Sequence, residues 1–277
     1  MSVIALAGKG GTGKTTVAAL LVRHLVRLGT VLAIDADPSS NLNLVLGLPL
    51  TTTVGDIREQ MLAGVQSGSV GTGITRHDFL NAQIRLAVEE EEHVDLLVMG
   101  RPEGQGCYCP VNHMLRQIID GLGRSYDFVV IDNEAGMEHL SRRTTRDVDI
   151  LLVITDPTVR GLKAAEGIVK LASDLQINVG RAMLVVNRVE GELSPVLRQA
   201  LAGLDTAGPL QGIALGGIIP ADPQVGEFDA VGRPLVELGA DSPAAQAIEA
   251  LADKLLRIPT LGASPLSDLT VPNRSHL

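Results

Sequence analysis

The chain has 277 residues, and 45% of them are hydrophobic, which is enough to bury one large core, so we expect a single domain. Only 2% are aromatic and none is Trp, so the predicted core consists of Val, Leu, Ile and Ala, as in parallel strands buried on both faces. A formal net charge of −9 argues against a nucleic-acid partner, whose phosphates require a basic surface. The apolar run 3–7 is too short for a membrane span and no charged region precedes it, so we expect a cytoplasmic protein with no membrane partner.

A glycine-rich stretch follows this run and fits the phosphate-loop pattern G-x-x-x-x-G-K-[ST], between a predicted strand and a predicted helix. Glycines let backbone N–H groups face phosphate oxygens, and the start of the next helix adds partial positive charge. Lys14 is predicted to reach the outer phosphates of ATP, and the Thr15 hydroxyl to hold Mg²⁺. A turn without a ligand explains the glycines but not the Lys-Thr pair. The predicted nucleotide-binding residues of this loop are Gly10, Gly11, Thr12, Gly13, Lys14, Thr15 and Thr16.

Lys9 adds a second positive charge inside the loop, which an ordinary phosphate loop does not need. The sequence Lys-Gly-Gly-x-Gly-Lys-Thr-Thr resembles the deviant-loop ATPases related to MinD, ParA and the nitrogenase iron protein. The resemblance implies that Lys9 contacts nucleotide held by a second subunit, and hence a nucleotide-dependent homodimer. The alternative is a solvated surface lysine.

Acidic residues follow two of the predicted strands. Asp35 and Asp37 come after the apolar run 31–34, and because they are two residues apart they project to the same side. Asp132 ends the predicted strand 127–132, a Walker B pattern in which the acid holds a water of the Mg²⁺ shell. The resemblance implies that Asp35 supports the magnesium shell and that Asp37 orients the attacking water. The alternative for Asp37 is a cap of the next helix.

The only two cysteines, Cys107 and Cys109, follow a predicted strand at 94–99. In extended chain both sulfurs point to one side, and two thiolates are half of a tetrahedral four-sulfur set. A two-fold dimer that apposes this segment completes the set. Two buried small hydrophobic residues, or a redox pair, are the alternatives.

The cysteine motif with the following Pro-Val-Asn-His, and the segment 132–141, resemble the CooC-type nickel-insertion ATPases that mature carbon monoxide dehydrogenase, and their relatives that serve acetyl-CoA synthase. The resemblance runs from residue 1 to about residue 256. It implies that the cysteines of two subunits form a nickel site at the dimer interface and that ATP hydrolysis releases nickel to such a client. Thiolates bind zinc and iron as readily, so ligand type alone does not name the metal.

Other residues near these motifs are possible ligands. Gly136 is expected to offer a backbone N–H to the γ-phosphate, and His113 and His139 are possible further nickel ligands. An iron–sulfur cluster held by the four cysteines is one rival, although related cluster proteins space their cysteines differently. A ParA- or MinD-like positioning ATPase is another, disfavoured by the acidic charge and by a terminal helix that is not basic.

The rest of the chain alternates predicted strands and helices. Asn187 lies in the predicted strand 182–188 and matches the position that reads the adenine edge in the family that the sequence resembles, with a turn-forming Asn as the alternative. The resemblance also implies that Asp222 lies in the loop that closes over the base in these relatives. The glutamate run 89–92 is interpreted as the solvated end of a helix. We therefore predict a three-layer α/β P-loop NTPase domain with a mainly parallel central sheet over residues 1–257, and a poorly ordered tail over 258–277.

Overall fold

The structure is a computed structural model of the chain. It describes residues 1–57, 59–60, 82–100, 125–134, 147–175, 177–204, 210 and 213–257. Within these residues, no helix is both long enough and apolar enough to cross a membrane.

Strands of the described residues form one eight-stranded sheet in the order β3-β4-β2-β5-β1-β6-β7-β8. In chain order they are β1 (Ser2–Gly8), β2 (Val31–Ala36), β3 (Glu89–Glu90), β4 (Val94–Val98), β5 (Phe128–Asn133), β6 (Asp147–Thr155), β7 (Asn178–Val189) and β8 (Ala214–Pro220). Every neighbouring pair is parallel except β3 and β4. The carboxyl ends of seven strands therefore meet at one edge, with β1 near the middle.

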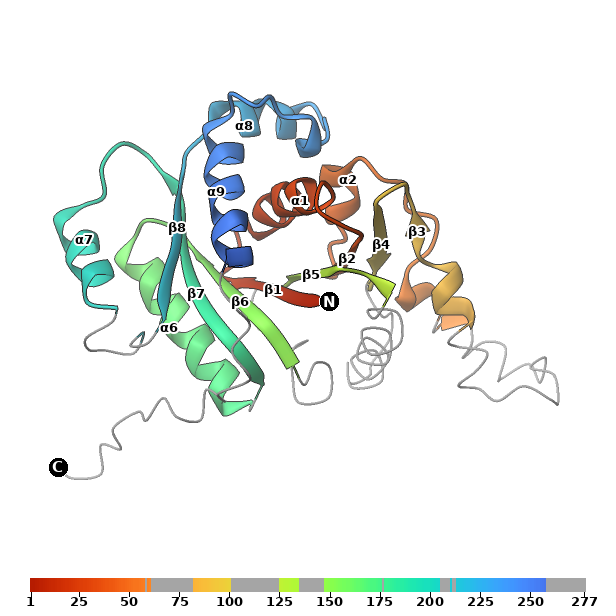
Figure 1. Cartoon of the computed structure of the whole chain (residues 1–277), viewed down its shortest axis with the longest axis horizontal. Coiled ribbons are helices and arrows are strands. Elements are labelled where there is room, and N and C mark those ends of the chain that lie inside the picture. Colours follow the sequence, from red (N-terminus) through yellow and green to blue (C-terminus); the bar gives the residue numbers. More distant parts are fainter. Residues whose placement is uncertain are drawn as a thin grey trace.

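Helices cover both faces of this sheet (Figure 1). They are α1 (Lys14–Leu25), α2 (Leu42–Leu46), α6 (Val159–Asp174), α7 (Pro195–Ala202), α8 (Pro223–Ala230), the 3₁₀ helix η3 (Leu235–Glu237) and α9 (Pro243–Arg257). Buried residues of α1, α2 and α9 join one core cluster, and buried residues of α6 and α7 join the other. The predicted three-layer α/β fold with a mainly parallel sheet is confirmed.

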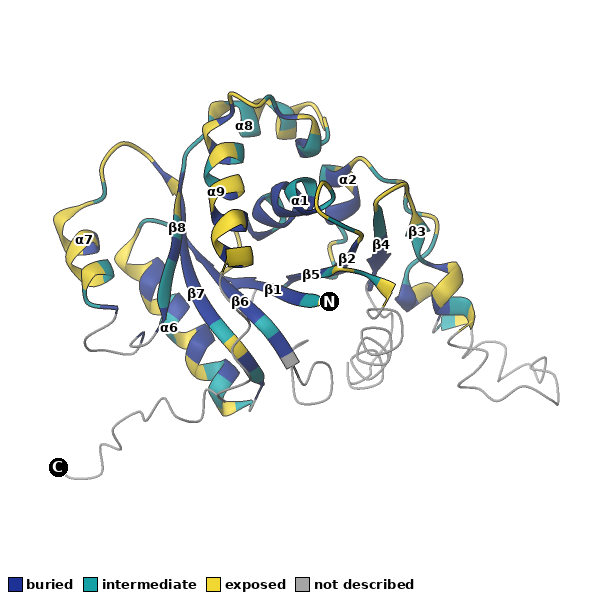
Figure 2. Ribbon diagram, viewed as in Figure 1, coloured by how far each residue is buried: buried dark blue, intermediate teal, exposed yellow. Residues whose placement is uncertain are grey.

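Alternation along the central strand shows how one sequence supplies both cores. Val3 and Ala5 of β1 belong to the cluster under α6, whereas Ile4 and Leu6 belong to the cluster under α1. All four are at most 3% exposed. Figure 2 shows the same arrangement, with a mainly dark blue sheet between α6 and α9, whose outer faces are yellow, while α1 has no exposed residue. Because both faces are covered, these strands have the continuous aliphatic sequence predicted from the composition.

The interpretation of the glutamate run as a helix end is wrong. Glu89 and Glu90 form the short strand β3, which pairs antiparallel with Asp95 and Leu96 of β4 at the edge of the sheet. The residues are solvated as expected, but charged side chains are also a common feature of edge strands, where they prevent pairing with other chains.

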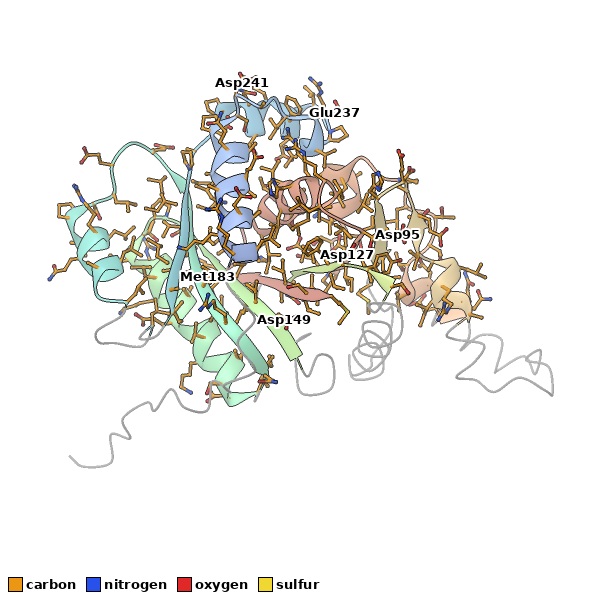
Figure 3. The ribbon with its side chains drawn as sticks, viewed as in Figure 1. Asp95, Asp127, Asp149, Met183, Glu237 and Asp241 are labelled. Carbon is orange, nitrogen blue, oxygen red and sulfur yellow. The ribbon has the colours of Figure 1, made fainter. Side chains whose placement is uncertain are left out.

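Carboxylates at the opposite, amino-terminal edge have structural partners. Asp127 precedes β5 and accepts hydrogen bonds from the backbone N–H (2.9 Å) and hydroxyl (3.1 Å) of Thr30, which hold its pKa below the usual range. Asp149 of β6 accepts a hydrogen bond of 2.7 Å from the Val3 N–H. Figure 3 labels both side chains. Their contacts join neighbouring segments of the fold, whereas ligands of open α/β sheets bind at the opposite, carboxyl edge.

Candidate functional site

The glycine-rich loop joins β1 to α1 at the carboxyl edge of the sheet. Gly11 (φ 81°) and Gly13 (φ 86°) take left-handed conformations that glycine adopts without strain. The Thr12 hydroxyl donates a hydrogen bond of 2.8 Å to the carbonyl oxygen of Lys9, which closes the loop on itself. Among the described residues, no side chain caps the start of α1. The helix therefore presents free N–H groups where an anion is best bound.

The two lysines of the loop differ in exposure. Lys14 is buried, with 7% of its surface exposed, and its charge acts on the carboxylate of Asp132. Lys9 is exposed. Lys14 is thus held within the site, whereas Lys9 points its charge to solvent, where a second molecule can reach it. Contact of Lys9 with a partner's nucleotide stays a prediction.

Thr15 and Asp132 are joined directly. The Thr15 hydroxyl donates a hydrogen bond of 2.6 Å to Oδ2 of Asp132, although the two residues are far apart in the chain. Asp132 is 1% exposed, and its Oδ1 atom has no hydrogen-bond partner in the described part of the chain. Burial raises the pKa of Asp132 to about 7, and the carboxylates of Asp35 and Asp37 add to this, while the Thr15 hydrogen bond and the Lys14 charge oppose it.

This arrangement fits a magnesium ion. A buried carboxylate with a free oxygen gains most from a cation, and a threonine hydroxyl beside it supplies the second oxygen ligand. In the described ranges, no group of three or more His, Cys, Asp or Glu side chains is arranged to hold a metal ion by itself. The site thus matches Mg²⁺ that takes its remaining ligands from phosphates and water, as is usual for this ion.

Asp35 lies beside Asp132 because β2 and β5 are paired in register at these two residues. It is fully buried, and its oxygens accept hydrogen bonds of 2.9 Å from the backbone N–H groups of Asp37 and Leu42. Burial raises its pKa to about 6, and these two hydrogen bonds oppose the shift. Asp35 therefore shapes the turn from β2 to α2 as well as adding negative charge to the site.

Asp37 is only half-buried, and its Oδ1 accepts a hydrogen bond of 2.8 Å from the Ser39 N–H. This contact belongs to the turn after β2 and not to the helix cap considered as an alternative, because α2 begins at Leu42 after Asn41. Its role toward a water molecule stays a prediction.

Asn187 lies at the end of β7 and is 4% exposed. Its Nδ2 donates a hydrogen bond of 2.8 Å to the Thr12 carbonyl of the glycine-rich loop, and its Oδ1 accepts one of 2.9 Å from the Arg188 N–H. Asn187 thus joins β7 to the loop, and adenine recognition by the remaining amide valences stays a prediction.

Asp222, the other predicted base contact, caps α8. One oxygen accepts a hydrogen bond of 3.0 Å from Gln224 N–H, and the other accepts from the Ser242 hydroxyl (2.6 Å) and the Ala244 N–H (3.2 Å). These contacts tie the start of α8 to the start of α9. They account for the carboxylate structurally, and a contact with nucleotide stays a prediction.

Two residues at this edge were missed by the sequence analysis. Arg188 donates a hydrogen bond of 2.8 Å from Nη1 to the Gly11 carbonyl. Asn133 is 1% exposed, and its Nδ2 donates a hydrogen bond of 2.8 Å to the Leu6 carbonyl, which joins the end of β5 to β1 just before the loop. The only sequence signal for either is a polar residue next to a strand-end residue already singled out.

The remaining predicted site residues, Cys107, Cys109, Gly136, His113 and His139, lie outside the described residues. The structure places only the residues that precede them. Met99 and Gly100 follow β4, and Asn133 and Glu134 end β5 or follow it, all at the carboxyl edge. The two segments therefore leave the sheet at the same edge as the glycine-rich loop.

Comparison with known proteins agrees with this geometry. Residues 3–235 match the CobQ/CobB/MinD/ParA nucleotide binding domain. An uncharacterized ATP-binding protein of Methanocaldococcus jannaschii is 43% identical over 255 residues, which cover 92% of this chain and 98% of that protein. The carbon monoxide dehydrogenase accessory protein CooC of Rhodospirillum rubrum is 36% identical over 184 residues, 63% of this chain and 70% of its own length.

Among solved structures, the septum site-determining protein MinD from Pyrococcus horikoshii, complexed with Mg-ADP, shares the fold with a TM-score of 0.64. It is 24% identical, and the match covers 92% of this chain and 96% of that one. Since the family model spans most of the chain and the glycine-rich loop, Lys14, Thr15 and Asp132 converge at one edge, the chain belongs to the CobQ/CobB/MinD/ParA family of nucleotide-binding domains.

Proposed function

We propose that this protein is an ATP-hydrolysing metallochaperone. In this proposal ATP brings two copies of the chain together, and Cys107 and Cys109 of both copies hold one nickel or zinc ion, the cargo. Hydrolysis reopens the dimer and delivers nickel to a client such as carbon monoxide dehydrogenase or acetyl-CoA synthase. The cysteine pair and the similarity to the CooC accessory protein support the cargo and the client.

The observation that carries the ATPase half is the free, buried Asp132 oxygen beside Thr15 and Lys14. Thr15 and Asp132, supported by Asp35, are the residues that would hold Mg²⁺, and bound Mg²⁺ would neutralise charge on the terminal phosphates. Lys14 binds the outer phosphates from within the same chain. Asp37 orients the attacking water, and Lys9 neutralises charge on the nucleotide of the other copy.

A backbone contact supports coupling between this site and the cysteines. The Met99 N–H, directly after β4, donates a hydrogen bond of 2.8 Å to the carbonyl oxygen of Asp35. The cysteines follow Met99 by eight and ten residues. In this proposal, a shift of the β2 end on binding of nucleotide and Mg²⁺ would reach Met99, which lies at the end of the described residues before the cysteines. By linkage, metal held by the cysteines must then change nucleotide affinity by the same factor.

The test is metal and acid-labile sulfide content per dimer, prepared without oxygen after separate loading with nickel, zinc and iron. Each is measured with and without a non-hydrolysable ATP analogue. We expect about one divalent ion per dimer, dependent on the analogue, because two cysteines from each copy complete one tetrahedral set. Cys107→Ser with Cys109→Ser should abolish binding. His93→Ala is the matched control: it removes an exposed histidine near Glu92 that is not part of the cysteine set, so the stoichiometry should be unchanged.

Other outcomes separate the rivals. Four irons with sulfide per dimer would replace the proposal with a cluster-carrying ATPase. The family itself includes MinD, and one MinD, from Synechocystis, is 25% identical over 236 residues, so a positioning ATPase is the second candidate. No cysteine-dependent metal, together with ATP-dependent pelleting with liposomes or a salt-sensitive DNA shift, would favour that candidate.

A further inference from the structure

The carboxyl end of β7 is irregular where it meets the glycine-rich loop. The register between β7 and β8 shifts between Val186 and Val189, so that Asn187 and Arg188 stand opposite a single residue of β8. Arg188 has a left-handed backbone conformation (φ 59°), which is unfavourable for any residue with a side chain. In a regular strand two successive side chains point to opposite faces, but this bulge turns both toward the loop.

The two side chains bind two successive carbonyl groups of the loop. Asn187 Nδ2 lies 2.8 Å from the Thr12 oxygen, and Arg188 Nη1 lies 2.8 Å from the Gly11 oxygen. We call Asn187 and Arg188 together the β7 clamp. The two residues also contact each other, because Asn187 Oδ1 accepts the hydrogen bond of 2.9 Å from the Arg188 N–H. The guanidinium also lies close to Gly13, where a Cβ atom would be 3.6 Å from both Nε and Nη2.

This clamp controls the direction of the loop's peptide groups. A trans peptide group is planar, so fixing the carbonyl oxygen on one side directs the next N–H to the other. The Gly11–Thr12 peptide is also held by the Thr12 N–H, which donates a hydrogen bond of 3.3 Å to the Lys9 carbonyl, so the contacts from β7 act together with this turn. Without these contacts the glycines flanking Thr12 would let the peptides rotate, and a carbonyl turned inward would repel phosphate oxygens. Holding the Gly11 and Thr12 oxygens on β7 therefore keeps the loop ready for an anion before one arrives, which lowers the ordering cost of binding.

We infer that Arg188 is a positioning residue for nucleotide binding: its guanidinium, aimed by the left-handed bulge, holds the Gly11 carbonyl away from the phosphate site. Strained backbone at a site is retained where it serves the site. If Arg188 had no role in the site, its replacement by glycine would relieve the strain at this φ and leave nucleotide affinity unchanged. If Arg188 positions the loop, the same replacement lowers nucleotide affinity. This inference rests on the nucleotide-binding half of the proposed function and not on the metal cargo.

The experiment compares Arg188→Gly with Arg188→Ala, because glycine relieves the left-handed strain and alanine does not. The dissociation constants for Mg-ATP and Mg-ADP are measured by titration calorimetry, and the free energy of unfolding is measured without nucleotide. Both variants should lose affinity equally, by about tenfold, as expected for one hydrogen bond from a charged donor. The glycine variant should be the more stable of the two. Affinity then follows the guanidinium, while stability follows the backbone.

Two further variants complete the design. Arg188→Lys keeps the positive charge and an N–H donor for the Gly11 oxygen, so it should bind nucleotide more tightly than the alanine variant. Arg198→Ala controls for the loss of one positive charge, because it removes an exposed arginine of α7 that is paired with Glu192. This variant should bind nucleotide like the unaltered chain. Unaltered affinity in both Arg188 variants, or a loss confined to the less stable alanine variant, would overturn the inference. Failure of the unaltered chain to bind nucleotide would instead overturn the proposed function itself, and with it this inference.

Discussion

Asp132 is the residue whose ionisation is most altered by the site. It is buried between the glycine-rich loop and Asp35, and this burial raises its pKa to about 7. A group whose pKa is higher in the folded state than in the unfolded chain holds a proton that the unfolded chain has lost. Stability therefore falls as the pH rises from about 4, the ordinary Asp value, to about 7. Without Mg²⁺ and nucleotide, the ionised Asp132 carboxylate therefore lowers the stability of the folded state at neutral pH.

Replacement of Asp132 by Asn removes this dependence. In EDTA and without nucleotide, Asp132→Asn should match the unaltered chain in free energy of unfolding near pH 4 and exceed it by an amount that grows up to about pH 7 to 8. Denaturant unfolding at several pH values measures this. Asp127→Asn is the matched control of opposite sign, because hydrogen bonds from Thr30 lower the pKa of Asp127. Its variant should be destabilised at neutral pH, and the difference should vanish as the pH falls through that lowered pKa. Equal pH profiles for both variants would contradict the account.

The affinity for Mg-ATP should depend on the protonation of the same carboxylates. Both Asp132 and Asp35, with pKa values raised to about 7 and about 6, must be ionised to act on the cation, so the affinity for Mg-ATP should fall by about tenfold between pH 8 and pH 6. Calorimetric titration at each pH measures it. The nucleotide's own phosphates also titrate in this range, and the profile of Asp132→Asn isolates their part. An equally steep profile in that variant would show that Asp132 does not hold the ion.

Two glycines of the glycine-rich loop are needed for different reasons. Gly11 and Gly13 have almost the same left-handed φ, but their surroundings differ. A Cβ atom on Gly13 would lie 2.5 Å from Asn187 Nδ2, whereas one on Gly11 would meet nothing within 4 Å. The first glycine position is needed for backbone conformation alone, and the second also for the close approach of β7.

This difference predicts unequal effects of alanine at the two positions. Gly11→Ala should cost about 1 to 2 kcal/mol of stability, the strain of a left-handed residue. Gly13→Ala adds a steric conflict that pushes Asn187 off the Thr12 carbonyl, so it should be less stable than Gly11→Ala and bind Mg-ATP at least about tenfold more weakly than that variant. Unfolding free energies and calorimetric affinities of the matched pair test this. Equal affinities would mean that β7 does not position the loop.

For the whole molecule, α9 is the last described element, and it packs on α1, the helix that follows the phosphate loop. Leu251 and Leu255 of α9 are 2% and 3% exposed, and they belong to the same core cluster as α1. His24 of α1 lies between Glu249 and Asp253 of α9, with nitrogen to oxygen distances of 3.5 and 3.4 Å. The helix α9 thus supports the nucleotide site indirectly, through its packing on α1.

We propose that the domain ends with α9, as predicted from the sequence. A chain truncated after Arg257 should unfold at the same denaturant concentration as the full chain and bind Mg-ATP equally. Leu251→Ala in the full chain should cost about 2 to 5 kcal/mol, the usual cost of a buried leucine. Denaturant unfolding and calorimetry compare the two changes. A truncated chain as unstable as the Leu251 variant would show that residues 258–277 belong to the domain.

Local sequence was sufficient for much of this architecture. The strand-loop-helix at the start of the chain and the aliphatic strands of the sheet were predicted, because each depends on residues adjacent in the chain. The helices α7 and α8 were not. Thr15, Lys14 and Asp132 were assigned to one site for the same reason: each belongs to a motif with a fixed spacing. The prediction of a helix end at the glutamate run was wrong because two edge-strand residues have no periodic pattern that distinguishes them from a helix end.

Contacts between distant segments, by contrast, could not be predicted from local sequence. Arg188 and Asn133 act on carbonyl groups more than a hundred residues away, and Asp222 caps α8 while also binding the start of α9. A single polar residue after a strand carries no local sign of which backbone group it will meet, since that depends on strand order and on a bulge in β7. The glycine-rich loop and the aliphatic strands were therefore enough to predict a phosphate-binding site in a parallel α/β fold, whereas the strand pairing selects which side chains hold the loop in place.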